Sequence, residues 1–186
     1  MFSNFIPLLV ISALCDESAA KTSWDCEPKS ISAHSTNENL LKVDLRMERV
    51  GRDGFFFTGI VFWNIDMDES VMVELELYRS TTGAESDYKL TPMSIPRQTF
   101  IEYINTYYKD MVIKNLGECS DLPRYKDQYV PPWPKKNYTL TRCSINGVGM
   151  PEVLLAGFYK IKANISHPEV NQQVIAIIKV TPKMFR

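Results

Sequence analysis

Two segments on either side of a glycine turn constrain the fold more than any other part of the chain. In Leu40–Val50 apolar side chains alternate with charged ones, which is typical of a β-strand with one buried face. Gly51–Gly54 reads GRDG, a tight turn in which the glycines supply the unusual backbone angles. Phe55–Trp63 (FFFTGIVFW) follows as a strand that is apolar on both faces. Together these segments predict an antiparallel hairpin.

Three more segments have the character of strands. Val71–Tyr78 alternates again, and a short turn, Asn64–Ser70, precedes it. This segment is therefore predicted to pair with the hairpin as the third strand of an antiparallel meander. Further strands are predicted at Leu154–Ile165 and Val174–Val180, with a polar turn at Ser166–Gln173 between them. The predicted class is therefore mainly β, with at least five strands in a two-sheet antiparallel sandwich or flattened cup.

The middle of the chain changes to a helical period. Apolar residues recur through Arg97–Met111 at the spacing of one face of an amphipathic helix. Pro96 is predicted at the helix start, where its missing N–H costs nothing, and Gly117 is predicted near the helix end. Ser120–Lys136 is predicted to be a long loop, because its PPWP run at Pro131–Pro134 is incompatible with a helix or a central strand.

The N-terminus indicates the compartment. Phe2–Cys15 is an apolar run too short to span a membrane, and small residues follow it up to Ala20. This layout predicts a secretory signal peptide over residues 1–20. A buried N-terminal helix is the alternative, which the two acidic residues after the run disfavour. The rest of the chain, residues 21–186, is expected to be one secreted, extracellular domain.

Nothing in the sequence argues for catalysis. Lys and Arg number 21 against 22 Asp and Glu, and this near-neutral balance gives no support for nucleic-acid binding. The two histidines, His34 and His167, are predicted in loops, away from any cluster with the spacing of metal ligands. Asp66–Glu69 lacks the spacing of a calcium loop and is interpreted as a solvated turn. No catalytic residue, metal or cofactor is predicted. A lipid hydrolase using His34 or His167 is the disfavoured enzymatic alternative.

Cysteines and sequons fit a secreted protein. The first of the four cysteines leaves with the signal peptide, so two of the remaining three are expected to pair. Of the three possible pairings Cys119–Cys143 is favoured because it closes a short loop, which leaves Cys26 free, buried or paired with another chain. Asn137 and Asn164 begin the sequons NYT and NIS and are predicted glycosylation sites.

The large side chains of Phe55–Trp63 allow two interpretations. One face of the strand could pack on the core while the other lines a cavity for an apolar ligand. Alternatively the strand is buried between two layers, and physical reasoning alone favours this second interpretation. The helix at Phe100–Met111 has the same ambiguity, and an aromatic stripe of this kind belongs more often to a core than to a lid.

The order of several motifs carries a family resemblance. Gly59–Asp68 reads G-x-x-F-W-N-I-D-M-D, and an alternating strand and a helix before a cysteine follow it. NYTLTRCSING then begins at Asn137 and GFYKI at Gly157. Over about residues 24–182 the chain resembles the insect chemosensory B family, secreted proteins related to the ganglioside activator protein and, more distantly, to the lipid-recognition fold.

The resemblance implies a fold and a role. It implies a cup of two β-sheets whose apolar interior holds a lipid without transforming it. The activator protein extracts membrane lipids and presents them, and the chemosensory relatives act in taste organs in the perception of cuticular hydrocarbon pheromones. Cys119 and Cys143 match a loop disulfide of the activator-like fold. The chain departs from that fold at Cys26, because no later cysteine near the C-terminus could pair with it.

The expected function is binding of an apolar small molecule, a lipid or a cuticular hydrocarbon, in gustatory pheromone perception. A chemosensory receptor or channel is a further expected partner, and nucleic acid is not. The alternative is an extracellular interaction module with a dry core that docks on a receptor or channel, which a cavity below about 300 Å³ would favour. The candidate cavity-lining residues are Val43, Leu45, Phe55, Phe57, Val61, Trp63, Val73, Leu75, Phe100 and Ile104.

Overall fold

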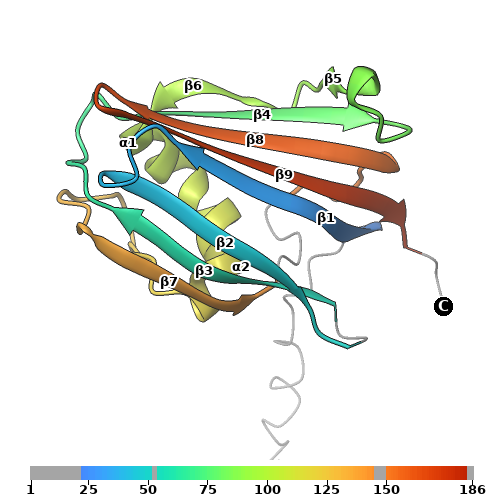
Figure 1. Ribbon diagram of the computed structural model, residues 1–186, viewed down its shortest axis with the longest axis horizontal. Helices are drawn as coiled ribbons and strands as arrows, with labels where there is room; N and C mark the ends of the chain where they lie inside the picture. The colour runs from blue at the N-terminus through green and yellow to red at the C-terminus, as the bar shows by residue number, and fades with distance from the viewer. Residues whose placement is uncertain (1–21, 52–53, 145–149, 184–186) are drawn as a thin grey trace, which may run out of the picture.

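The computed structural model describes residues 22–51, 54–144 and 150–183. The predicted signal peptide, residues 1–20, lies outside the described residues, as does the centre of the predicted GRDG turn. The described chain is mainly β, with two antiparallel sheets and one helix, and this confirms the predicted class. The two sheets face each other, and the helix lies beside them (Figure 1).

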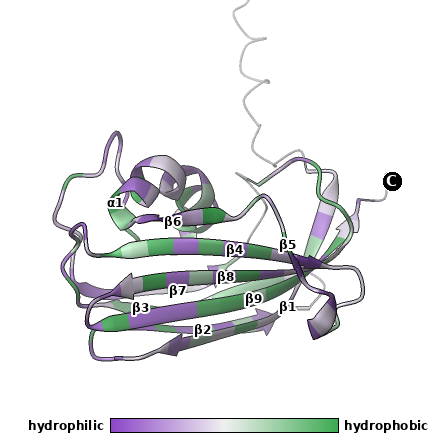
Figure 2. Cartoon of the chain, turned by 90° about the horizontal axis from the view of Figure 1, so that it is seen from above, coloured by the Kyte–Doolittle hydropathy of each residue, from purple (hydrophilic) through white to green (hydrophobic). Residues whose placement is uncertain are grey.

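The larger sheet has six strands. Its order is β1-β9-β8-β4-β5, and β6 also pairs with β4. Every pairing is antiparallel, and β8 and β9 form a long hairpin through Pro168 and Glu169. Hydrophilic and hydrophobic residues both recur along these strands (Figure 2), as expected where one face of a sheet is buried and the other meets water. The strands span Trp24–Ser35 (β1), Met72–Ser80 (β4), Lys89–Leu90 (β5), Ile95–Thr99 (β6), Gly157–His167 (β8) and Val170–Pro182 (β9).

The smaller sheet contains the predicted hairpin. Strands β2 (Leu41–Arg49) and β3 (Phe55–Trp63) pair as expected, and β7 (Lys136–Cys143) adds to the free edge of β3. Gly59 allows the close approach of β3 to β2, because a Cβ at this position would lie 2.0 Å from the backbone oxygen of Asp44. Its φ of +153° also favours glycine.

The predicted meander is wrong at its third strand. β4 follows β3 closely in sequence but pairs with β8, β5 and β6 in the larger sheet. The connection between them is a crossover from one sheet to the other. Its side chains Ile65, Met67 and Val71 are buried, so the segment fills the end of the sandwich rather than forming a hairpin turn.

The helix begins later than expected and continues further. Pro96 lies in β6 rather than at a helix start, and a capping box of Thr99 and Glu102 begins the helix at Phe100. Gly117 lies inside the final helical turn with φ of −60°, so it does not end the helix. The helical segments are α1 (Phe100–Tyr103), the π-helical η2 (Ile104–Ile113), α2 (Lys114–Leu116) and η3 (Gly117–Cys119); a separate 3-10 turn, η1, spans Glu85–Asp87.

The helix joins the edges of the two sheets. It starts from β6 of the larger sheet, and its last residue, Cys119, forms a disulfide with Cys143 at the end of β7. The predicted pairing is therefore confirmed, and Cys26 is free. The loop between Cys119 and β7 contains a cis peptide bond between Pro131 and Pro132. No helix of the described residues is long and apolar enough to cross a membrane.

Aromatic side chains fill one end of the interior. Trp133, from the PPWP loop, lies at the centre of this cluster, and its ring contacts side chains from β3, β7, the helix and its own loop. Its aromatic neighbours are Trp63, Phe100, Tyr108, Tyr125, Tyr129 and Tyr138, with ring centroids 5.5–6.3 Å away. The interior at this end is therefore a packed core.

Candidate functional site

The other half of the interior contains two adjoining cavities. We call the first the β4-side cavity, and it has a volume of about 120 Å³. Strands β4, β6, β8 and β9, the helix and the segment Met150–Ala156 form its wall. Its lining residues are Leu75, Glu76, Leu77, Met93, Ile95, Met111, Met150, Pro151, Leu154, Tyr159, Ile161 and Ile178.

The second, the β1-side cavity, lies between the two sheets and also has a volume of about 120 Å³. Strand β1 forms one side of it, and the smaller sheet and the end of the helix form the other. Its lining residues are Cys26, Pro28, Ser30, Ile31, Leu45, Phe57, Leu116, Leu140, Met150, Ile161, Ala176, Ile177 and Ile178.

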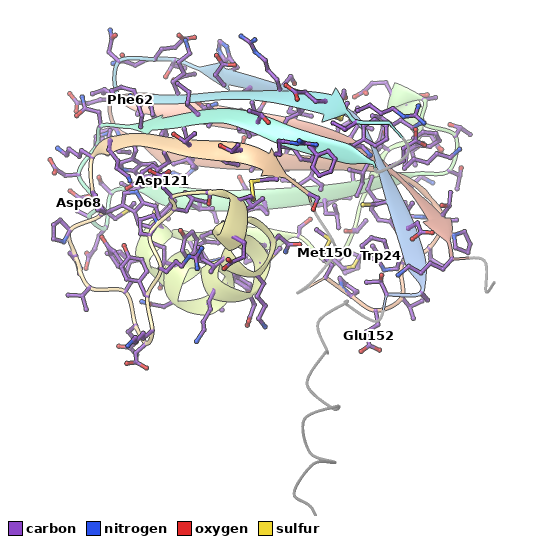
Figure 3. All side chains as sticks on the ribbon, turned by 90° about the horizontal axis from the view of Figure 1, so that it is seen from below. Trp24, Phe62, Asp68, Asp121, Met150 and Glu152 are labelled. Atoms are coloured by element: carbon purple, nitrogen blue, oxygen red, sulfur yellow. A yellow bond between two sulfur atoms is a disulfide. The ribbon has the colours of Figure 1, made fainter. Side chains whose placement is uncertain are left out.

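Three side chains line both cavities: Met150, Ile161 and Ile178. Ile161 and Ile178 belong to the paired strands β8 and β9, so the sheet fixes them. Met150 belongs to Met150–Ala156, which we call the strap and which leads into β8. The strap closes the cup at the end where β1 begins, and Figure 3 shows Met150 close to Trp24 there.

Hydrogen bonds hold the strap against the start of β1. The Trp24 indole N–H donates to the Pro151 carbonyl oxygen at 2.9 Å, and the Ser23 backbone N–H donates to the Glu152 carbonyl oxygen at 2.9 Å. Further along, the Tyr159 hydroxyl donates to the Leu155 carbonyl oxygen at 2.9 Å. These bonds fix the backbone of the strap although it has no regular secondary structure.

The walls are apolar and nearly uncharged. Glu76 is the one charged residue among the described lining residues of the two cavities. Cys26 contributes a thiol to the β1-side cavity, and burial, with the negative charge of Asp25 as a smaller cause, raises its pKa. This thiol is therefore protonated at neutral pH and acts as an apolar wall group.

The tyrosines of the packed end are also neutral. Burial raises the pKa of Tyr103 to about 12, and it raises the pKa of Tyr108 still further. The Tyr108 hydroxyl donates to the Pro123 carbonyl oxygen at 2.9 Å. Apart from Glu76, the described residues that line the two cavities thus offer contacts for an apolar group and no charged side chain that would bind an ionic one.

The ten candidate lining residues fall into three groups. Leu45, Phe57 and Leu75 line the cavities. Trp63, Val73, Phe100 and Ile104 belong to the packed aromatic end, and Val61 packs beside it. Val43 and Phe55 are half-buried and line neither cavity.

The sequence reasoning missed the residues that line both cavities. Ile161 and Ile178 lie in predicted strands, and their alternation within those strands could have marked them as inward-facing. Met150 carries no such signal, because it stands in an irregular segment between strands. The strand β3 itself contributes one face to the interior, and its other face carries Ile60, which is 37% exposed, so β3 is not buried between two layers.

The histidines lie elsewhere. His34 is in β1 rather than in a loop, and His167 ends β8. Both lie at the far end of the β8–β9 hairpin from the strap, on polar surface grooves away from the two apolar cavities. Within the described ranges, His, Cys, Asp and Glu side chains form no group of three or more that could hold a metal ion.

The fold and its interior define a two-sheet β-cup with an apolar, partly hollow interior. Residues 73–161, from β4 to β8, match the family described as "Protein of unknown function (DUF1091)". This range includes the helix, both disulfide cysteines and the strap. No curated protein matches the chain.

Proposed function

We propose that this protein is a secreted, non-enzymatic carrier of an apolar ligand, a lipid or a hydrocarbon. The observation that carries the proposal is the pair of adjoining apolar cavities inside the cup, one between the two sheets and one between the larger sheet, the helix and the strap. Burial of each methylene group is worth about 0.8 kcal/mol, so an aliphatic chain can bind without a polar anchor. The disulfide supports secretion, because such bonds persist in oxidising compartments.

The positions of the two sequons also support secretion. Asn137 is exposed in β7. Asn164 lies on the outer face of the larger sheet, and its Oδ1 accepts a hydrogen bond from Gln173 Nε2 at 2.9 Å. That bond leaves the amide nitrogen of Asn164 available for a glycan.

The biological setting of the proposal comes from the sequence resemblance. As in the chemosensory B family, the ligand would be a cuticular hydrocarbon or related lipid, and the role gustatory pheromone perception. A chemosensory receptor or channel would then take the loaded protein as its partner.

Native mass spectrometry of the secreted, glycosylated protein tests the proposal. We expect a bound apolar molecule, or uptake of added long-chain hydrocarbon, that organic extraction removes. Ala176→Leu, which adds volume inside the β1-side cavity, should reduce uptake several-fold by steric exclusion. Ile175→Leu, on the same strand but outside both linings, is the control and should bind normally. Folded protein that takes up no apolar molecule would contradict the proposal.

A second function, an interaction module with a dry core, is favoured by the cavity volumes. Neither cavity alone reaches the roughly 300 Å³ of a typical small-molecule site. The strap also presents Val153 and Leu155 to solvent, 72% and 66% exposed, as a docking contact would. For this function the same mass spectra would show folded protein without ligand, and replacing both exposed residues with serine would weaken receptor or channel binding.

A further inference from the structure

The boundary between the two cavities contains one side chain that can move without disturbing the sheets. Ile161 and Ile178 are β-branched residues within paired strands. Met150 is unbranched and flexible, and it reaches the boundary from the strap. The strap backbone beyond it is bonded to Ser23 and Trp24, so the side chain rather than the strap is the adjustable part.

The size of each cavity limits what it can hold alone. An engineered apolar cavity of about 150 Å³ holds one benzene molecule. A cavity of about 120 Å³ therefore has room for a group no larger than a single ring. A fused-ring molecule exceeds either cavity, whereas a slender chain could occupy both if the Met150 side chain turned aside.

We propose that the ligand is an unbranched apolar chain that spans both cavities, and that Met150 determines the selectivity for unbranched chains. This inference rests on the proposed carrier function. The side chain of Met150 lies between the two cavities, and the bound ligand displaces it or passes beside it. Its thioether offers a soft, adaptable contact to a thin chain but blocks a wide or rigid one. Because the walls of the two cavities carry almost no charge, the part of the ligand that lies inside the protein must be uncharged.

Paired methionine variants test the role of Met150. The folded, secreted protein is offered straight-chain hydrocarbons, methyl-branched hydrocarbons and cholesterol, and bound molecules are compared by native mass spectrometry. We expect the wild type to prefer straight chains, and Met150→Ala to reduce this preference at least about tenfold by admitting the wider molecules. Met72→Ala removes the same side chain from β4 at a position outside both linings and should leave the preference for straight chains intact.

The possible results distinguish a failure of the Met150 inference from a failure of the carrier function. A wild type that binds none of the molecules offered and carries no bound apolar molecule from its source would overturn the carrier function itself. A wild type that binds straight chains and cholesterol alike, or an equal effect of the two methionine variants, would overturn the inference and leave the carrier function standing.

Xenon provides a measurement that needs no variant. In a crystal of the unliganded wild type under xenon pressure, we expect xenon on both sides of Met150. Xenon on one side only, or on neither, would show that the two spaces are not the paired apolar cavities that the inference requires.

Discussion

Replacing Trp133 with alanine is expected to lower the free energy of unfolding by about 3–5 kcal/mol, the cost of deleting a large buried aromatic side chain. Trp133 is 4% exposed and packs against rings from the helix and from the smaller sheet. Its loss would leave a cavity at the centre of the packed end and remove the main contact of its loop. Urea unfolding followed by circular dichroism measures the change.

Two controls accompany the Trp133 variant. The Trp133 indole N–H has no hydrogen-bond partner among the described residues, so Trp133→Phe loses no hydrogen bond and, by keeping a ring in the site, should cost clearly less than Trp133→Ala. Val130→Ala, at an exposed position of the same loop, should change the free energy of unfolding by less than about 0.5 kcal/mol. Equal losses for Trp133→Phe and Trp133→Ala would mean that ring packing is not what stabilises this site, and a small loss for Trp133→Ala would mean that the aromatic end is not a packed core.

Removing the disulfide is the second large effect. The double variant Cys119→Ala/Cys143→Ala should lose about 3 kcal/mol, because the bond closes a loop with a sequence separation of 24. In a domain of this size that loss lowers the melting temperature by roughly 6–12 °C. The bond joins the end of the helix to the end of β7, so its loss should also loosen the Leu116 and Leu140 wall of the β1-side cavity.

Reductant supplies an internal control for the disulfide. The wild type should lose a similar amount of stability in dithiothreitol, and the double variant should be insensitive to it. Cys26→Ala should change the free energy of unfolding much less and should keep the response to reductant, because Cys26 is a free thiol. Equal losses for Cys26→Ala and the double variant would contradict the pairing.

The β2–β3 hairpin could be predicted from the sequence, but the sheet to which the next strand, β4, belongs could not. β2 and β3 form the predicted hairpin, with bounds within a residue or two of those predicted. β4 alternates equally well, yet alternation shows only which face is buried and not which strands pair. The buried side chains of the short connection, Ile65 and Met67, are the sign of a crossover that the turn interpretation overlooked.

Four strands escaped the sequence analysis, the short β5 and β6 and the longer β1 and β7, and the two longer ones are edge strands with polar residues. β1 (Trp24–Ser35) has few buried residues and lies at the edge of its sheet beside β9, where solvent reaches much of it. β7 follows the proline-rich loop and alternates through Tyr138 and Leu140, a signal that the nearby prolines and the sequon obscured. Pro96 in β6 also lies on an edge strand, where its missing N–H removes no ladder hydrogen bond.

The candidate site could be predicted only in part. Leu45 and Leu75 were found because each lies on the apolar face of an alternating strand, and Phe57 because one face of its strand was expected to line a cavity. That rule cannot distinguish the packed end from the hollow end, since Trp63 and Val73 share the same faces. The difference arises from Trp133, which fills one end from a distant loop, and from Met150, which enters the other from the strap.

The central claim is that the two adjoining cavities inside the cup receive an apolar chain. The most direct measurement is a crystal structure of the secreted, glycosylated protein soaked with a straight-chain hydrocarbon. We predict continuous electron density through both cavities, passing Ile161 and Ile178, with the Met150 side chain displaced from its place between them. An interior without ligand density, whose walls have closed to fill both cavities, would contradict the account.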